Sequence, residues 1–418
     1  MKIAYICLFL GKLQTGVLKS LRDRAKTAED LGLDIDIFVI NKFKEQSEEN
    51  VNYVKIKRQF PALYFHTLYI YDRNFRKYRF IEKYIDLKNY DLIILRYLFA
   101  DKTGIEFARK FKVITEHHTD TVSEMTNYIK ICRSLPRMFF RCVKKYFLEK
   151  RYGHLMLKNC KGIIAVTDEI NNIELSRINH SIPSITIPNG IGVENIKMTG
   201  FTPFDGKNLD IVFITSSLFP WNGFERLLSS MKNYKGNINV TLHIIGAVDQ
   251  NEFSKILGYF DCVKFHGLKL EEDLDEIMGK MNLAIGTLAL FKNNIEEACS
   301  LKTREYVARG IPFVLAYKDP DLLNVRPDFK FHLSFENNNS SIDMGDIISF
   351  AREVSKNPVE ISSCMRSYAL QNLDWSIKMK KLMRFVENVE NQKRITSKPS
   401  ANKYKIQDKE KAIVCRLG

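Results

Sequence analysis

Two glutamates, Glu297 and Glu305, stand eight residues apart in a part of the chain whose pattern predicts strand, loop, helix and strand. The apolar run over residues 282–290 has the length of a buried strand. Ser300 is a candidate N-cap, apolar residues then recur at helical spacing, and Gly310 is a typical residue to end the helix. The predicted helix therefore begins between the two glutamates.

The N-terminus of this predicted helix is suited to bind an anion. Its free N–H groups and the positive end of its dipole favour a phosphate or a diphosphate, which we expect at Ser300 and Leu301. A carboxylate beside a bound phosphate would repel it, so Glu297 and Glu305 fit better as acceptors of hydrogen bonds from neutral hydroxyl groups. The hydroxyls of a sugar and of a ribose meet this requirement. The alternative is that both glutamates are solvated charges, because this spacing also occurs by chance.

Two segments of the chain, residues 1–40 and 209–246, predict the same series of strand, loop, helix and strand. Further apolar strands follow in each half, so that strands alternate with helices. This order is typical of doubly wound parallel sheets in an α/β fold. Ligands of such sheets bind beyond the carboxyl ends of the strands, and two facing sheets would share one cleft. A chain of 418 residues fits two such domains.

Cysteine usage and hydropathy favour a cytoplasmic protein. The eight cysteines are scattered without a C-x-x-C pair or metal-ligand spacing, which fits reduced and mostly buried thiols. Only Lys2 precedes the first apolar run and no small-residue cleavage site follows it, so we expect no signal peptide. No apolar segment approaches the length of a membrane span. We therefore expect a soluble protein, or one bound to a membrane at its surface.

The Glu-x7-Glu spacing, set between predicted strands and followed by the sequence RGIP, resembles the motif of glycosyltransferase family 4. Members of that family are retaining glycosyltransferases with the GT-B fold, so the resemblance implies two facing Rossmann-like domains with a cleft between them. The first glutamate of the motif meets the transferred sugar, and the second meets the ribose of the nucleotide. By this resemblance Glu297 is a catalytic residue and Glu305 binds the donor. The run EACSLKTREYVARGIP is similar to a branch that builds bacterial surface polysaccharides.

The resemblance covers roughly residues 1–390 and implies the domain organisation. We expect an N-terminal acceptor domain over 1–197, a C-terminal domain for the nucleotide sugar over 198–376, and a helix over 377–392 that returns to the N-terminal domain. The boundary lies beside a turn-rich stretch. Residues 393–418 are basic and nearly without apolar periodicity, which predicts a disordered tail.

Three adjacent residues, Glu116, His117 and His118, end an apolar run that predicts an inner strand. Their position resembles that of the family's active-site histidine, and His118 matches it better than His117. A histidine at a strand end is more often a packed residue than a catalytic one, and that alternative stays open. We expect no metal site, because adjacent residues of a strand point to opposite faces and no third cluster supplies ligands.

Two glycine-bearing turns resemble further parts of the family's site. Gly11 and Gly16 lie in the first loop, where glycine lets the backbone approach the donor or the acceptor. Asn189 and Gly190 form a Pro-Asn-Gly turn that would line the cleft. The alternative for both pairs is that they are ordinary turn residues.

The second half departs from the family's pattern around the donor diphosphate. The loop after its first strand lacks the usual lysine, and Ala298, Cys299 and Ser300 replace the common Gly-Phe-Gly. Charge that develops on a leaving diphosphate needs a cation. We expect Lys302 to be the substitute, with a solvated surface lysine as the alternative. Arg304 and Arg226 are the next candidates for this cation after Lys302. The other positions at which we expect donor binding are Ser216, Asn222, Gly223, Gly267 and Arg304.

Two segments that mix cations with aromatic residues contribute to the formal net charge of +15. Residues 128–152 carry eight cations and one acid, interleaved with apolar residues, which is typical of a basic amphipathic helix. Residues 54–80 form the second segment. We expect this face to dock on the anionic inner face of the cytoplasmic membrane and to reach a lipid-linked acceptor. The alternative is a solvated helix whose apolar side packs into the domain.

We therefore predict a retaining, metal-independent hexosyltransferase of bacterial surface-polysaccharide biosynthesis that uses no cofactor. A UDP- or GDP-linked sugar would be the donor, and a glycan or lipid-linked sugar the acceptor. A sugar-nucleotide epimerase is the alternative, because it shares the two-sheet architecture. A basic nucleic-acid-binding protein is a distant second alternative without a binding motif, and we expect no nucleic-acid partner. A dehydrogenase would need G-x-G-x-x-G after the first strand, and the chain lacks it.

Overall fold

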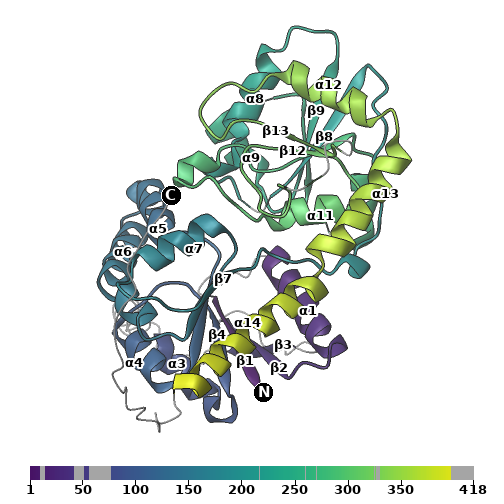
Figure 1. Cartoon of the computed structure of the whole chain (residues 1–418). Coiled ribbons are helices and arrows are strands. Elements are labelled where there is room, and N and C mark those ends of the chain that lie inside the picture. The colour runs from purple at the N-terminus through teal and green to yellow at the C-terminus, as the bar shows by residue number, and fades with distance from the viewer. Residues whose placement is uncertain are drawn as a thin grey trace, which may run out of the picture.

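The structure is a computed structural model that describes residues 1–9, 15–41, 51–55, 77–215, 217–258, 260–269, 271–323, 325 and 330–396. These residues form two bodies, each built on a parallel sheet with helices packed against it (Figure 1). The predicted α/β fold with two doubly wound sheets is confirmed. The second basic segment lies mostly outside the described residues, as does the chain from 397 onward.

The N-terminal sheet has seven parallel strands in the order β3-β2-β1-β4-β5-β6-β7. Its central strands are buried on both faces, which is typical of a parallel sheet covered by helices on both sides. The strands are β1 Ile3–Phe9, β2 Ile35–Asn41, β3 Val51–Lys55, β4 Leu92–Arg96, β5 Val113–His117, β6 Gly162–Ala165 and β7 Ser184–Thr186. The helices are α1 Thr15–Asp30, α3 Lys77–Tyr84, α4 Lys102–Lys110, α5 Thr121–Ile131, α6 Pro136–Leu157 and α7 Asp168–Ser176.

The C-terminal sheet has six parallel strands in the order β10-β9-β8-β11-β12-β13. The strands are β8 Asn208–Ile214, β9 Asn239–Ile245, β10 Val263–Gly267, β11 Leu283–Ile285, β12 Phe313–Leu315 and β13 His332–Ser334. The helices of this domain are α8 Phe224–Asn233, α9 Gln250–Leu257, α10 Glu271–Gly279, α11 Leu301–Arg309, α12 Met344–Val354 and α13 Pro358–Tyr368, and they are followed by the last helix, α14 Trp375–Thr396. Short helical turns are η2 Leu87–Asn89, η3 Cys132–Ser134, η4 Val193–Asn195, η5 Pro220–Asn222, η6 Leu290–Asn293 and the π-turn η8 Ala369–Leu373.

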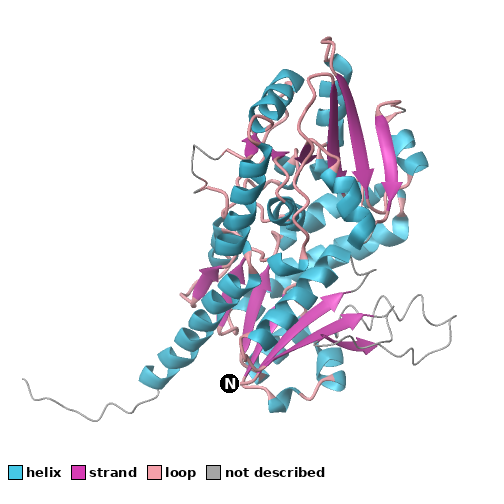
Figure 2. Cartoon of the chain, turned by 90° about the vertical axis from the view of Figure 1, so that its right-hand side faces the viewer, coloured by secondary structure: helices cyan, strands magenta, loops and turns pink. Residues whose placement is uncertain are grey.

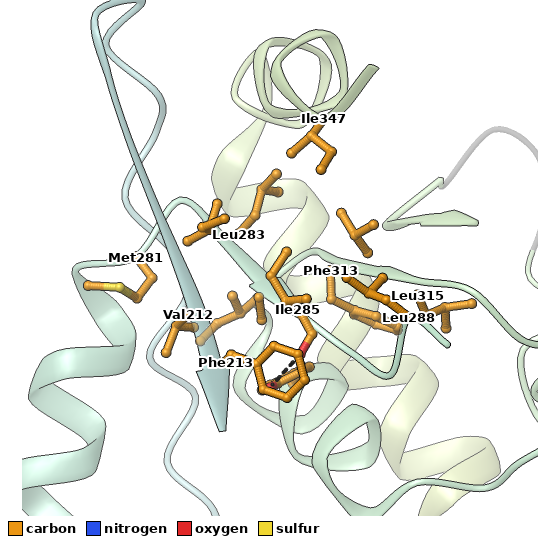
Figure 3. Close-up of a cluster of buried hydrophobic side chains, with 14 of the residues drawn as sticks. Val212, Phe213, Met281, Leu283, Ile285, Leu288, Phe313, Leu315 and Ile347 are labelled. Atoms are coloured by element: carbon orange, nitrogen blue, oxygen red, sulfur yellow. Dashed lines mark hydrogen bonds between the residues drawn. The ribbon is translucent and has the colours of Figure 1, made fainter. Parts of the chain in front are cut away.

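Each sheet has its own apolar core. Two clusters cover the two faces of the N-terminal sheet, and one large cluster fills the C-terminal domain. Figure 3 shows part of the latter, where side chains of β8, β11 and β12 meet Ile347 of α12. Ile191, Val193 and Ile196 already belong to this cluster, so the chain enters the second core before residue 197.

The last helix, α14, crosses back and packs on the N-terminal sheet beside α1 (Figure 1). Trp375, Met379, Leu382 and Phe385 follow helical spacing and join the core on that face. The helix includes the segment 377–392 and continues to Thr396, into the first residues of the predicted tail. No helix in the described ranges combines the length and the hydropathy that crossing a bilayer requires.

The two sheets are oriented so that their carboxyl ends approach each other. Figure 2 shows the strand arrows of both domains pointing toward the boundary between them. Loops that follow the strands therefore meet at this boundary, where ligands of doubly wound sheets bind.

Candidate functional site

The helix that the sequence predicted between the two glutamates is α11, which begins at Leu301. Ser300 occupies the N-cap position with extended backbone, but its side chain makes no capping hydrogen bond. Gly310 ends the helix with a φ of 77°, a left-handed conformation that favours glycine. The first amides of α11 are thus not capped by Ser300 and keep their capacity to bind an anion.

Glu297 lies in the loop before α11 and reaches the N-terminal domain. Its Oε2 atom accepts a hydrogen bond of 2.9 Å from the N–H of Glu169, in the first turn of α7. In return, Oε2 of Glu169 accepts bonds of 2.8 Å from the N–H groups of Glu296 and Glu297. Backbone hydrogen bonds to Lys318 tie the same loop to the chain after β12. Glu297 therefore sits at the domain boundary, on a loop that is held from both sides.

Glu305, inside α11, is partly buried and also faces the N-terminal domain. Its Oε1 atom lies 3.1 Å from Nη2 of Arg309 and 3.5 Å from Nζ of Lys19 on α1. The start of α1 comes close to the same helix, since a Cβ added to Gly16 would lie 3.9 Å from Cδ1 of Leu301. The structure thus brings both glutamates of the motif, and the start of α1, to one boundary.

Lys302, the second residue of α11, is a cation for which the described residues supply no counter-ion. Its Nζ lies 4.2 Å from the centre of the Phe213 ring near the end of β8, and no carboxylate in the described part of the chain pairs with it. Burial lowers the pKa of Lys302 to about 7, because the charged form loses its water. A bound diphosphate would supply the missing negative charge, so this position fits the cation that the sequence predicted.

Arg304, two residues further on, is engaged differently. Its guanidinium is 1% exposed and forms a bidentate pair with Asp319, together with a bond of 2.9 Å to Asp321. Arg226 donates to backbone carbonyl groups of the neighbouring loops. Both guanidinium groups therefore serve the packing of the C-terminal domain, and this geometry speaks against diphosphate binding by Arg304.

The residues predicted at the ends of the other strands lie at the same edge of the C-terminal sheet. The amide of Asn222 makes hydrogen bonds of 2.7 and 3.2 Å within the loop after β8. Gly223 has a φ of 78°, and a Cβ there would lie 2.7 Å from that of Leu288, so glycine is required. Gly267 ends β10 with a φ of 68° and open space around it. Ser216 lies outside the described residues.

The Pro-Asn-Gly turn contacts the segment just before α11. Nδ2 of Asn189 donates a hydrogen bond of 2.6 Å to the carbonyl of Cys299. A Cβ on Gly190 would lie 2.7 Å from the ring of Trp375 at the start of α14, which explains the glycine. Burial raises the pKa of the Cys299 thiol, which speaks against a nucleophile at this position. Gly11 lies outside the described residues.

The two histidines at the end of β5 differ in exposure. The side chain of His117 is 0% exposed, stacks on Tyr97 with ring centres 4.4 Å apart, and has Nδ1 3.3 Å from Glu174. The side chain of His118 is 16% exposed, and its Nε2 lies 3.3 Å from Oε2 of Glu116. Burial lowers the pKa of His118 to about 4, so its ring is neutral near pH 7. Of the two, His118 is the better placed to contact a ligand.

One group of described residues brings three potential metal ligands together, namely Cys299, Asp319 and Asp321. Arg304 and Lys378 already pair with its two carboxylates, each at 2.7 Å. The positive charges that the carboxylates need are therefore supplied by side chains, and the group reads as an ion-pair network.

Sequence reasoning missed Glu169 and Lys19, which contact the two glutamates from the other domain. Thr167 caps α7 by accepting a hydrogen bond from the N–H of Ile170, and two acidic residues follow it. The sequence Thr-Asp-Glu after an apolar strand was a visible signal for a helix start. The partner of Glu169 lies 128 residues further along the chain, where no local pattern could indicate it.

Comparisons of sequence find no protein-family model that matches and no similar curated protein. Comparisons of structure find many similar chains. The apo form of the lipopolysaccharide outer core galactosyltransferase WaaB is 12% identical, with a TM-score of 0.56 over 94% of this chain and 100% of the other. Sucrose-phosphate synthase from Thermosynechococcus elongatus is 14% identical, with a TM-score of 0.61 over 94% and 99%. Anabaena HepE in complex with UDP-glucose is 15% identical, with a TM-score of 0.58 over 93% and 100%.

Identities this low establish the fold and leave the substrate open. The similarity extends over nearly all of this chain and of each similar structure, so it includes both domains. Membership of family 4 stays a prediction that rests on the motif. The chain has the GT-B fold of the glycosyltransferases that it resembles.

Proposed function

We propose that the protein is a retaining glycosyltransferase of bacterial surface-polysaccharide synthesis, which moves a sugar from a UDP- or GDP-linked donor to a glycan or lipid-linked acceptor. The observation that carries the proposal is the start of α11. Its first amides and Lys302, which has no counter-ion among the described residues, lie between Glu297 and Glu305. A diphosphate would find both hydrogen-bond donors and a positive charge there. Further support comes from Anabaena HepE, whose solved structures include complexes with UDP and UDP-glucose.

In this proposal the donor lies on the C-terminal domain. Glu305 accepts hydrogen bonds from the ribose hydroxyls, and Glu297 accepts them from hydroxyls of the transferred sugar. The amides at Leu301 and the ammonium of Lys302 hold the diphosphate. The neutral ring of His118 contacts the sugar from the N-terminal domain.

The proposed reaction needs no enzyme nucleophile. The acceptor hydroxyl attacks the anomeric carbon from the face that the diphosphate leaves, which keeps the anomeric configuration. The bond from this carbon to the diphosphate oxygen breaks, the bond to the acceptor oxygen forms, and the departing phosphate takes the proton. Because helix amides and Lys302 stabilise the charge that develops on the diphosphate, we propose that neither a metal ion nor a cofactor is needed.

The variant Glu297→Gln tests this assignment. Its amide oxygen can still accept the N–H of Glu169, so the domain contact is spared. The full chain is incubated with UDP- and GDP-sugars and membrane lipids, and the products are analysed for linkage and anomeric configuration. We expect transfer to fall by about 100-fold or more, with unchanged thermal stability. Near-normal transfer by the variant, or an inverted product, would contradict the proposal. A changed sugar without any acceptor would point to the epimerase.

For the acceptor side, we propose that helix α6, at the outer side of the N-terminal domain, docks on an anionic membrane (Figure 1). Phe140 is 69% exposed and Phe147 is 64% exposed, while Leu135 and Met138 are exposed nearby. Their exposure disfavours the alternative in which the apolar side of this segment packs into the domain. Exposed cations of the same segment are Lys130, Arg133, Lys150 and Arg151. Aromatic residues beside cations suit an anionic lipid surface.

Vesicle flotation tests this surface. We expect the full chain to float with phosphatidylglycerol vesicles at low salt and not with pure phosphatidylcholine. The double variant Phe140→Ser, Phe147→Ser should bind about 10-fold more weakly or worse, since two aromatic side chains are lost from the lipid. The matched control Ile256→Ser, Val359→Ser changes two exposed apolar residues of the C-terminal domain and should bind normally. Equal binding by both double variants, or no binding at all, would refute the docking surface.

A further inference from the structure

Glu169 and the loop that carries Glu297 are joined across the domain boundary by three hydrogen bonds, which we call the reciprocal clamp. Oε2 of Glu169 accepts the N–H groups of Glu296 and Glu297, each at 2.8 Å. Oε2 of Glu297 accepts the N–H of Glu169 at 2.9 Å. Each carboxylate thus bonds to backbone of the opposite domain. Bonds from N–H groups to carboxylates are stronger than bonds between neutral groups.

The clamp is anchored on both sides. On the N-terminal side it joins the first turn of α7, where the helix dipole favours an anion such as the Glu297 carboxylate. On the C-terminal side, backbone bonds of 2.9 and 3.1 Å pair Glu296 and Ala298 with Lys318. The backbone at residues 296–297 is therefore gripped by both domains at once, which requires that the domains stay in contact.

We propose that Glu169 is a positioning residue for Glu297. This inference rests on the proposed function, in which Glu297 contacts the transferred sugar. Two of the three clamp bonds start from backbone N–H groups, so they persist when the Glu297 side chain turns from α7 to the sugar. Glu169 then fixes the backbone from which Glu297 reaches its substrate, and it does so only while the domains touch. The clamp couples domain contact to the readiness of the catalytic carboxylate.

Three variants of the full chain separate the clamp from a simple charge effect. Glu169→Ala removes the acceptor of both loop amides. Glu169→Gln keeps an oxygen that can accept both, so it should restore wild-type behaviour. Asp168→Ala is the matched control, because it removes the same charge from the same turn of α7 at an exposed side chain for which the structure gives no interdomain bond.

The first readout is amide hydrogen exchange in peptides that contain Glu296 and Glu297. We expect exchange to be about 10-fold faster or more in Glu169→Ala and normal in the other two variants, since only Glu169→Ala lacks an oxygen that accepts the two loop amides. The second readout is the release of UDP from UDP-glucose as a probe. Here kcat should fall by about 10- to 100-fold in Glu169→Ala, while KM changes by less than about threefold, because the diphosphate contacts are untouched.

Equal exchange in Glu169→Ala and in the wild type would overturn the proposal. So would an equal loss in Asp168→Ala, which would trace the effect to the charge of the first turn. A rise in KM alone, with kcat unchanged, would also contradict a positioning role. If the wild type turns over neither UDP-glucose nor any of the UDP- and GDP-sugars of the transfer assay, the proposed function fails, whereas the exchange experiment still decides whether the clamp holds the loop.

Discussion

Lys302 and Arg304 lie on the same helix, but their charges have different surroundings. The guanidinium of Arg304 is 1% exposed and contacts Asp319 and Asp321. The ammonium of Lys302 stands over the ring of Phe213, and burial lowers the pKa of Lys302 to about 7. Burying a charge is costly unless it is paired. The ion pairs of Arg304 therefore stabilise the fold. In the proposed function, the ammonium of Lys302 destabilises the fold until a diphosphate pairs with it.

The largest expected effect is on stability, in Arg304→Met. This change leaves the buried carboxylate of Asp319 without its cation, while Asp321 keeps Lys378, and it should cost about 3–5 kcal/mol of unfolding free energy. Urea unfolding of the variant and of the wild type measures the loss. Lys302→Met is the control, and its unfolding free energy should be unchanged or higher. A loss below about 1 kcal/mol in Arg304→Met would remove the contrast between the two cations.

For ligand binding, we expect the larger effect in Lys302→Met, the variant whose stability should not fall. Lys302→Met removes one charge-assisted contact to the diphosphate, so affinity for the cognate nucleoside diphosphate should fall by about 10- to 100-fold. Titration calorimetry at pH 7 measures this, with Lys302→Arg as a variant that keeps the charge and should retain more affinity. Unchanged affinity in Lys302→Met would mean that another group neutralises the diphosphate.

The pH dependence is a finer test of the same contrast. The pKa of free Lys302 is about 7, below its usual value, so its ammonium loses the proton as the pH rises above 7. The last proton of a phosphate has a pKa of about 6, so the diphosphate is mostly ionised in this range. Affinity should therefore fall by up to about tenfold per pH unit between pH 7 and 9, and this slope should vanish in Lys302→Met. A wild-type slope of zero would contradict an unpaired ammonium.

The same shift has the opposite sign for stability. Above pH 7 the unfolded chain binds the Lys302 proton and the folded chain does not. Stability without ligand should therefore rise with pH from about 7 toward the usual pKa of lysine, relative to Lys302→Met, and the penalty of the buried ammonium should be complete below about pH 7. Calorimetric melting of both proteins across this range measures the difference.

The extent of α11 could be predicted from sequence because its signals are local. Ser300 and Gly310 stand at the two ends, and apolar spacing fills the helix between them. Which of its two cations pairs with carboxylates could not be predicted. The carboxylates that pair with Arg304 lie 15 and 17 residues further along, in the chain after β12, and only the tertiary fold brings them back. Nothing in the local pattern distinguishes Lys302 from Arg304.

The same limit applies at the domain boundary. The alternation of strands and helices was enough to predict two parallel sheets, because it depends on each segment alone. How the domains meet depends on both surfaces, so the contacts of Glu297 with Glu169 and of Glu305 with Lys19 had no sequence signal. For His118, strand alternation placed it and its neighbour on opposite faces. Only the stacking of Tyr97 on His117 shows which of the two faces is buried.

A thermal-shift titration of the full chain with UDP, GDP, CDP and ADP, with Glu305→Ala alongside, examines the donor site most directly. A ligand that binds only the folded state raises the melting temperature according to its concentration relative to its dissociation constant. We expect one nucleoside diphosphate to raise the melting temperature of the wild type, and we expect Glu305→Ala to lose most of that rise. No shift with any diphosphate, or an equal shift in Glu305→Ala, would contradict a nucleotide-sugar site at α11.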